Sequence, residues 1–394
     1  MKIAWLAPYP INLLIPELKT SKNVAGHAAS WVLNLSNELA RQNNVEMHII
    51  THTAGIPYSQ VIEKNNIIFH VIRYCCPFTN RGFPPYLPLN ALTWYKGFTC
   101  KALTILERIQ PDIVHAHGTE NAFALTACKS GLPSLTSIQG IIVELNKISP
   151  SLFFRLQIPI EAYAVKRNKN FGCRTEWDKS FVLSINPDAN VFYVPEAIGN
   201  LFFKHKWGRT NPFSVLFVGY LSKRKGIEVL LHSISMTKRK FPQIVLKVVG
   251  SGPEKYLRYL MELTRQLNIE KNVAWLGSCG AEEIAGYLCG STIFILPTFI
   301  DNSPNSLAEA MAVGTPSIAS RVGGVPSMIE DGVDGLLVES NNAEELAAKI
   351  IALLGSEEMQ AGLSKNARAT ALRRNLPQQV AETVIDVYKA IISG

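Results

Sequence analysis

The chain has 394 residues, of which 47% are hydrophobic and 18% charged, and its formal net charge is +8 at pH 7. This length predicts two globular domains, each with an ample hydrophobic core. No apolar run reaches the roughly 18–20 residues of a membrane span, so the sequence predicts no spanning helix. The basic surplus favours an anionic partner, but the Lys and Arg residues are dispersed and form no known nucleic-acid module, which excludes nucleic acid.

Strand patterns alternate with helical ones in the first half, which is typical of a parallel, doubly wound sheet. The strands are expected at residues 2–7, 46–51, 67–72, 111–115 and 134–138. The helices are expected at residues 26–41, up to residue 108, and at residues 122–129. In such sheets ligands meet the loops that follow the strands, and one of these loops carries His117.

Three further features of the sequence bear on where in the cell the protein is found. Residues 1–10 begin with a strand pattern rather than a signal peptide. Residues 141–170 mix apolar clusters with bases, which indicates either a solvated amphipathic helix or a peripheral contact with the inner membrane surface. The seven cysteines show no CxxC spacing, so we expect reduced core thiols in a cytoplasmic protein.

Residues 204–212 are polar and turn-rich and predict the linker between the halves, after which the alternation restarts. The strands of the second half are expected at residues 214–219, 244–249, 273–276, 292–297, 317–319 and 336–338. The helices are expected at residues 227–238, 254–267, 281–289, 343–354 and 377–392.

A short helix after residue 302 has the clearest boundaries in the chain. Ser303 suits the N-cap, Pro304 the first helical position, and Gly314 the stop. Glu309 lies about 200° around the helix from Leu307, so it is predicted to face away from the core. It is either a ligand-binding carboxylate or an ordinary solvated one.

The start of this helix is a predicted anion site. The N–H groups of Asn305 and Ser306 are free of intrahelical partners there, and the helix dipole favours negative charge. Lys225 follows the turn after strand 214–219 on the same sheet edge, where it would compensate a diphosphate without a metal.

Several catalytic motifs are missing from the sequence. GxxxxGK[ST], GxSxG, HExxH and DxD do not occur, which disfavours P-loop NTPases, α/β-hydrolases and metalloproteases. Gly250-Ser251-Gly252 is followed by Lys255 where a dinucleotide fingerprint has its third glycine.

Taken together, the motifs resemble glycosyltransferase family 4, retaining nucleotide-sugar transferases with the α/β GT-B fold, in which two Rossmann-like doubly wound domains face each other across a cleft. The resemblance rests on the order and spacing of Gly219…Lys225-Gly226, Gly250-Ser251-Gly252-Pro253, Asp301…Glu309, Gly314-Thr315-Pro316 and Gly323-Gly324-Val325-Pro326. It implies an acceptor-binding domain over residues 1–203, a donor-binding domain over residues 204–376, and a C-terminal helix, residues 377–394, packing back on the first domain.

The resemblance also implies site residues. The catalytic ones would be His117, Lys225, Asp301 and Glu309. The donor-binding ones would be Gly26, Arg174, Tyr220, Arg224, Lys225, Asn305, Ser306 and Glu309. Glu309 would bind the ribose hydroxyls, Asp301 the sugar hydroxyls, and Lys225 the diphosphate. Tyr220 stands where the family usually has Arg, and Asp301 where it usually has Glu. The acceptor-binding residues stay open.

The implied activity is hexosyl transfer from a UDP-sugar or GDP-sugar to a glycan or lipid-linked acceptor, in bacterial surface polysaccharide or glycoconjugate biosynthesis, without cofactor or metal. Two alternatives share the architecture. One is a nucleotide-sugar 2-epimerase, and the other is a nucleotide-sugar binding protein that has lost catalysis.

Overall fold

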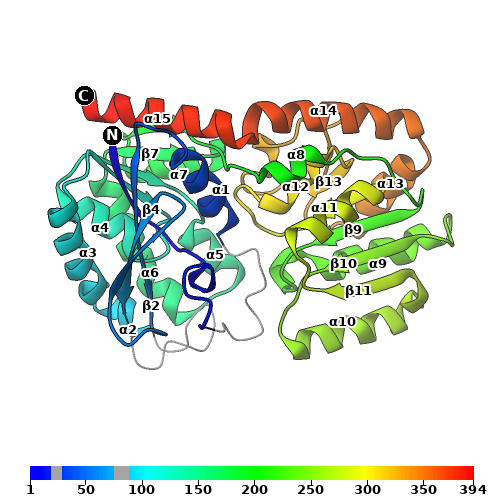
Figure 1. Cartoon of the computed structure of the whole chain (residues 1–394). Coiled ribbons are helices and arrows are strands. Elements are labelled where there is room, and N and C mark those ends of the chain that lie inside the picture. Colours follow the sequence, from blue (N-terminus) through cyan, green and yellow to red (C-terminus); the bar gives the residue numbers. More distant parts are fainter. Residues whose placement is uncertain (19–28, 75–87) are drawn as a thin grey trace. The chain divides into compact units, whose positions relative to one another are not determined.

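The computed structural model describes residues 1–18, 29–74 and 88–394, and the chain divides into two compact units (Figure 1). Unit 1 contains the described residues up to Ala197 together with Pro377–Gly394, and unit 2 contains Ile198–Leu376. Residues 204–212, predicted as a linker, hydrogen-bond within unit 2, where Trp207 N–H donates to the Val313 carbonyl at 3.0 Å. The predicted roles of acceptor and donor domain stay predictions.

Unit 1 is built on an eight-stranded sheet in the order β3-β4-β2-β1-β5-β6-β7-β8. All neighbouring strands are parallel except β3 and β4, which are antiparallel. The strands are β1 (Lys2–Leu6), β2 (Glu46–Thr53), β3 (Gln60–Lys64), β4 (Ile67–Arg73), β5 (Ile113–His117), β6 (Ser134–Ser137), β7 (Asn170–Cys173) and β8 (Asn190–Tyr193).

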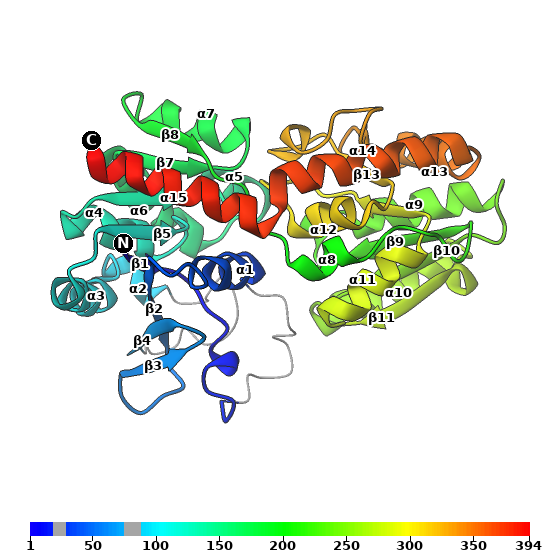
Figure 2. The same cartoon turned by 45° about the horizontal axis from the view of Figure 1, so that its top comes forward.

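Helices cover both faces of this sheet, because successive strand residues point to opposite faces. Ile3 and Trp5 join a core that includes α1 (Ser30–Leu39) and α15 (Pro377–Ser393), which pack on each other. Figure 2 shows α15 lying across this side of the sheet. Ala4 and Leu6 join the opposite core. The remaining helices of unit 1 are α2 (Leu89–Leu92), α3 (Lys96–Ile109), α4 (Ala122–Ser130), α5 (Ile142–Ile148), α6 (Leu152–Arg167) and α7 (Glu176–Ile185).

Unit 2 is built on a six-stranded, fully parallel sheet in the order β11-β10-β9-β12-β13-β14. Its strands are β9 (Ser214–Val218), β10 (Val245–Val249), β11 (Val273–Gly277), β12 (Ile293–Leu296), β13 (Ser317–Ser320) and β14 (Leu336–Val338). Numbered within the unit, this is the order 3-2-1-4-5-6 of a Rossmann sheet.

The helices of unit 2 again form two layers. Val215 and Phe217 of β9 join one core with α9 and α13, while Leu216 and Val218 join the other with α11 and α12. The helices are α8 (Asn200–Lys204), α9 (Ile227–Lys238), α10 (Glu254–Gln266), α11 (Ala281–Gly290), α12 (Asn305–Val313), α13 (Ala343–Leu354) and α14 (Glu357–Asn375). Short 3-10 turns are η1 (Ile11–Leu13), η2 (Lys223–Lys225), η3 (Glu270–Asn272) and η4 (Val325–Ser327).

Each sheet has one point at which the strand order reverses, and ligands of such folds bind beyond the carboxyl ends of the strands there. In unit 1 this point lies between β1 and β5, and in unit 2 between β9 and β12. The prediction of two doubly wound, Rossmann-like sheets is therefore confirmed.

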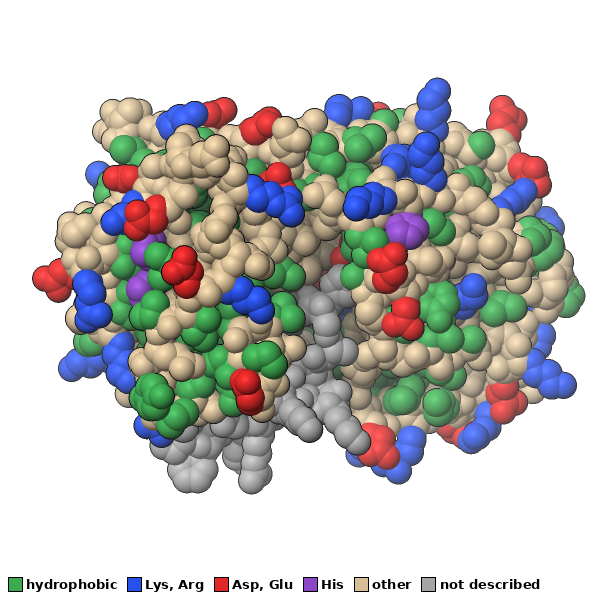
Figure 3. Space-filling view, in the orientation of Figure 1, with side chains coloured by type: hydrophobic (Ala, Val, Ile, Leu, Met, Phe, Trp, Pro, Cys, Tyr) green, Lys and Arg blue, Asp and Glu red, His purple; other side chains and the backbone are tan. Residues whose placement is uncertain are grey.

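Surface features follow from the same packing. No helix in the described part of the chain is long and apolar enough to cross a membrane. On the face drawn in Figure 3, Lys and Arg side chains lie scattered among acidic ones. The five cysteines within the described residues are free. Cys173 is buried, Cys279 and Cys289 are partly buried against a core of unit 2, and Cys100 is exposed, so the prediction of core thiols was wrong for Cys100.

Candidate active site

The reversal point of unit 2 is formed by two segments that touch through their backbones. Turn η2 follows β9, and residues 297–301 follow β12. Phe299 N–H donates to the Arg224 carbonyl at 2.8 Å. A Cβ on Gly226 would lie 1.8 Å from the Pro297 carbonyl oxygen, and Gly226 has φ +66°. Only glycine permits this approach, so Gly226 explains how Lys225 comes to face the segment ending at Asp301.

The charged side chains of these segments pair with each other. Lys225 Nζ lies 2.8 Å from Asp301 Oδ2, and Arg224 Nη1 lies 3.2 Å from Asp301 Oδ1. Burial lowers the pKa of Lys225, although Asp301 opposes that shift. Burial alone would raise the pKa of Asp301, but Lys225 and Arg224 bring it below its usual value. Two cations thus flank one carboxylate, which leaves a local charge of +1 for an anion.

Helix α12 places Glu309 differently from the prediction. Its side chain is only 3% exposed, so the alternative of a solvated carboxylate was wrong, and so was the expectation that it faces away from the core. The helix is buried on all sides from Leu307 to Val313. Burial raises the pKa of Glu309 to about 8. Asn305 and Ser306 are the first two helical residues and are partly exposed, so the helix begins one residue later than the prediction, which gave Pro304 the first helical position.

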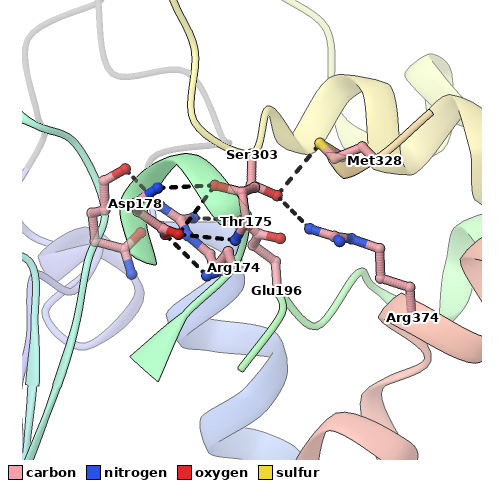
Figure 4. Close-up of polar contacts among 8 residues, drawn as sticks. Arg174, Thr175, Asp178, Glu196, Ser303, Met328 and Arg374 are labelled. Atoms are coloured by element: carbon pink, nitrogen blue, oxygen red, sulfur yellow. Dashed lines mark hydrogen bonds and ion pairs between the residues drawn. The ribbon is translucent and has the colours of Figure 1, made fainter. Parts of the chain in front are cut away.

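The start of α12 also differs from the prediction. The N-cap residue is Pro304 rather than Ser303. Figure 4 shows why: Ser303 Oγ accepts a hydrogen bond from Arg374 Nη2 at 3.1 Å and lies 3.5 Å from Met328 Sδ. Arg374 comes from the end of α14, a helix that the sequence pattern did not predict. At the other end of α12, Gly314 with φ +87° ends the helix as predicted.

The Gly250-Ser251-Gly252 loop packs against the turn after β9. A Cβ on Gly250 would lie 1.9 Å from the Gly219 carbonyl oxygen. Leu221 N–H donates to the Ser251 carbonyl at 2.8 Å. Tyr220, predicted to meet the donor, is 56% exposed. Gly250 and Gly252 therefore let the backbone of this loop approach the backbone of the turn after β9. This packing explains why the glycines are there without a role in binding a dinucleotide.

At the reversal point of unit 1 lies His117, the last residue of β5. Its ring packs at a tilt against Trp5, with centroids 4.2 Å apart, and against His115 at 4.0 Å. Burial lowers the pKa of His117 to about 3, and the charge of Arg174 adds to this effect. Among the described residues, neither ring nitrogen of His117 has a hydrogen-bond partner, although the side chain is only 4% exposed. A buried imidazole with two unused nitrogens indicates a place for a ligand.

Arg174, predicted to reach donor phosphates, is buried in unit 1 beside Glu196. Its Nη1 donates to Glu196 Oε1 at 2.5 Å, and its Nη2 donates to the Gln139 carbonyl at 2.6 Å. Figure 4 shows the adjoining turn, in which Asp178 accepts from the Thr175 N–H and caps α7. Contact of Arg174 with the donor stays a prediction. Gly26, the other predicted donor residue of the first half, lies outside the described residues.

Sequence reasoning found no pair of carboxylates beyond Asp301 and Glu309, but unit 1 brings two together. Glu161 of α6 accepts from Thr119 Oγ1 at 2.6 Å and from Ile142 N–H at 3.1 Å. Burial raises its pKa to about 8, and Glu120 adds to that shift. Burial also raises the pKa of Glu120, although hydrogen bonds from backbone N–H groups, including that of Gly140, oppose the shift. In the sequence, the feature that could have revealed this site is Glu161, a single acidic residue within the largely apolar stretch of α6.

Within the described ranges, no group of three or more His, Cys, Asp or Glu side chains is arranged to hold a metal ion.

Comparisons with known proteins agree with this geometry. The model of glycosyl transferases group 1 matches residues 200–370, and that of glycosyltransferase family 4 matches residues 28–198. An uncharacterized glycosyltransferase of Haemophilus influenzae is 30% identical over 370 residues, covering 93% of this chain and 96% of that protein.

Two solved structures have the same fold. Sucrose-phosphate synthase of Thermosynechococcus elongatus aligns with a TM-score of 0.80 at 20% identity, covering 100% of this chain and 99% of that one. Anabaena HepE, solved with UDP-glucose, aligns with a TM-score of 0.72 at 16% identity, covering 99% of this chain and 100% of that one. The chain belongs to glycosyltransferase family 4, with the GT-B fold, and transfers a sugar from a nucleotide sugar.

Proposed function

We propose that this glycosyltransferase moves a hexosyl group from a UDP-sugar or GDP-sugar, with retention of anomeric configuration, to a hydroxyl of a glycan or lipid-linked acceptor. Surface polysaccharide or glycoconjugate synthesis in a bacterial cytoplasm is the pathway class that uses such a reaction. UDP is favoured as the nucleotide because HepE, a protein of the same fold, is solved with UDP-glucose.

The observation that carries the proposal is the Lys225–Asp301–Arg224 arrangement at the reversal point of unit 2. The departing nucleoside diphosphate gains negative charge in the transition state, and fixed cations stabilise that charge best where water is scarce. Lys225 is only 12% exposed and is held in place by Asp301. It therefore supplies a preorganised positive charge, and the N–H groups of Asn305 and Ser306 add to it.

The other residues take complementary roles in the proposal. Asp301 accepts hydrogen bonds from the donor sugar. Glu309, whose pKa burial raises to about 8, meets the ribose hydroxyls. His117 is neutral and offers its ring nitrogens to the reacting sugar. The bond from the anomeric carbon to the β-phosphate oxygen breaks as the acceptor oxygen bonds to that carbon, and the acceptor proton passes to a phosphate oxygen.

A membrane contact would bring a lipid-linked acceptor to the enzyme. Leu92 and Trp94 near α2, and Ile148 and Leu152 at the α5–α6 junction, are exposed apolar side chains. Helices α2 and α5 both pack on α6, where Arg155 is also exposed. Apolar side chains beside a base suit the surface of an anionic bilayer, so we propose peripheral binding through this part of unit 1.

Thermal unfolding with UDP, GDP, ADP or NAD, each with EDTA present, tests the donor site. A nucleotide at 100 times its dissociation constant adds about 2.7 kcal/mol of stability. We expect one nucleoside diphosphate to raise the Tm of the wild type and of Lys223→Ala, but not of Lys225→Ala. Lys223 is the matched control because it lies exposed in the same turn. Stabilisation by NAD alone would overturn the proposal.

Product analysis tests the reaction itself. Proton NMR of the glycoside formed from an α-linked UDP-sugar should show an α linkage, and a β linkage would contradict retention. Conversion of the donor without any acceptor would instead favour the 2-epimerase.

A further inference from the structure

Four buried side chains form one hydrogen-bonded chain across unit 1. Trp5 Nε1 lies 2.9 Å from the Tyr388 hydroxyl, and this hydroxyl lies 2.6 Å from His115 Nδ1. On its other side, His115 Nε2 lies 2.8 Å from Ser137 Oγ. The four come from β1, α15, β5 and β6. Trp5, His115 and Tyr388 are completely buried, and Ser137 is 4% exposed.

The direction of every proton in this chain follows from the chemistry of the groups. An indole N–H can only donate, so the Tyr388 oxygen accepts from Trp5. The Tyr388 O–H then donates to His115 Nδ1, since that is its remaining partner among the described side chains. A neutral imidazole that accepts at Nδ1 carries its proton on Nε2, so His115 donates to Ser137. Burial lowers the pKa of His115, with His117 adding to the shift, which keeps the ring neutral.

The orientation of His117 depends on this chain. Its ring is held by tilted ring contacts with Trp5 and His115 and by no hydrogen bond from another described residue. Both of these rings are themselves hydrogen-bonded to the Tyr388 hydroxyl. A rotation of either ring would therefore change the direction in which the His117 nitrogens point.

We propose that Tyr388 is a positioning residue for catalysis: its hydroxyl holds Trp5 and the Nε2-protonated tautomer of His115, and these two rings aim His117 at the substrate. The inference rests on the proposed function, in which His117 meets the reacting sugar. Helix α15 thereby contributes a polar group to the active centre, rather than only apolar packing.

The test compares Tyr388→Phe with Tyr95→Phe. Tyr95 is a matched control because it is also buried in unit 1 and donates one hydrogen bond, to Gln157 Oε1 at 2.8 Å. In 15N-detected histidine NMR, the wild type should show His115 protonated on Nε2. Tyr388→Phe should mix the tautomers and shift the His117 resonances, and Tyr95→Phe should leave both unchanged. His117 resonances that do not move in Tyr388→Phe would overturn the proposal, whatever the activity.

Kinetics with UDP-glucose, or whichever sugar nucleotide the wild type turns over, supply the second readout. Tyr388→Phe should lower kcat about tenfold, as expected when a reacting group is misplaced, with the donor KM within about twofold. Added to His117→Ala, it should cause no further loss, because it acts through that ring. Full additivity of the two losses would contradict the proposal, whereas an inactive wild type would count against the proposed function only.

If Tyr388→Phe does not fold, Ser137→Ala probes the other end of the chain. It removes the acceptor of the His115 proton and should shift the His115 and His117 resonances as well. Unchanged His117 resonances in Ser137→Ala would equally overturn the proposal.

Discussion

The two reversal points of this protein use opposite electrostatics. In unit 2, Lys225 and Arg224 both pair with Asp301, where two segments touch through their backbones, and a local charge of +1 remains. In unit 1, His117 lies among neutral rings, and its pKa is lowered to about 3. Paired charges in a partly dry site can accept an additional anion at low reorganisation cost. Neutral rings packed against each other instead fix direction. The difference supports the proposal that the reversal point of unit 2 stabilises charge while that of unit 1 orients a group.

The largest expected effect concerns the backbone at the reversal point of unit 2, where Lys225, Arg224 and Asp301 form what we call the charged edge. In Gly226→Ala the new Cβ would overlap the Pro297 carbonyl, so we expect a loss of about 4 kcal/mol in unfolding free energy, measured by urea denaturation. Gly277→Ala is the control, because Gly277 has a similar φ of +69° and open space around it. It should cost only about 1–2 kcal/mol, the strain of left-handed backbone. Equal losses would show that the close approach is unimportant.

Removing the cation should weaken the charged edge without such a loss of fold. Lys225→Ala is expected to lower kcat/KM for the sugar nucleotide about 100-fold to 1000-fold, the range found when one preorganised donor is removed. Steady-state rates of Lys223→Ala should stay within about twofold of the wild type. A Lys225→Ala enzyme of normal activity would disprove the role of this edge in stabilising the leaving group.

Glu309 should make stability fall at high pH. Burial raises its pKa from 4.5 to about 8, so its protonated form stabilises the fold fully below pH 4.5, and this contribution is lost as the pH rises through 8. At about 1.4 kcal/mol per pKa unit, the upper limit is on the order of 5 kcal/mol.

Glu309→Gln cannot ionise, so its stability relative to the wild type should increase between pH 6 and pH 9. Urea unfolding at both values measures the difference, with the exposed Glu358→Gln as control. A difference independent of pH would argue against a buried, protonated Glu309.

The smallest expected effect concerns His117, which lies among neutral rings at the reversal point of unit 1. With a pKa of about 3, His117 does not titrate between pH 5 and pH 8. His117→Gln should therefore lower kcat/KM about tenfold without changing the shape of its pH profile. A limb near pH 6.5 that disappears in this variant would show that the ring acts as a titrating base.

Local sequence patterns were sufficient where an element buries apolar side chains at regular spacing. The sequence predicted the core strands of both sheets, the helices from residues 227, 343 and 377, and the stop of α12 at Gly314, because strand alternation, helical spacing and left-handed glycine are short-range properties. The order and spacing of the motifs that contain Lys225 and Asp301 carried the family resemblance, which named both as site residues.

Helix α14 shows where local patterns fail. Among its 19 residues six are buried, and half of these are polar: Gln360, Arg374 and Asn375. Its buried and half-buried polar groups find partners far away in sequence. Arg368, for example, donates to the carbonyls of His205 and Ala312 at 2.7 and 2.6 Å. A search for hydrophobic periodicity cannot detect a helix face whose polar side chains are hydrogen-bonded to distant parts of the chain.

What the sequence by itself determined, then, is the succession of strands and helices and the spacing of the glycine, Lys and carboxylate motifs, since each depends on neighbours within a few residues. Only the tertiary structure decided that Glu309 is buried, that Ser303 bonds Arg374 instead of capping α12, and that Tyr388 joins Trp5 to His115. These properties depend on the protonation and hydrogen bonding of buried polar groups, which are set by side chains brought together from distant parts of the chain.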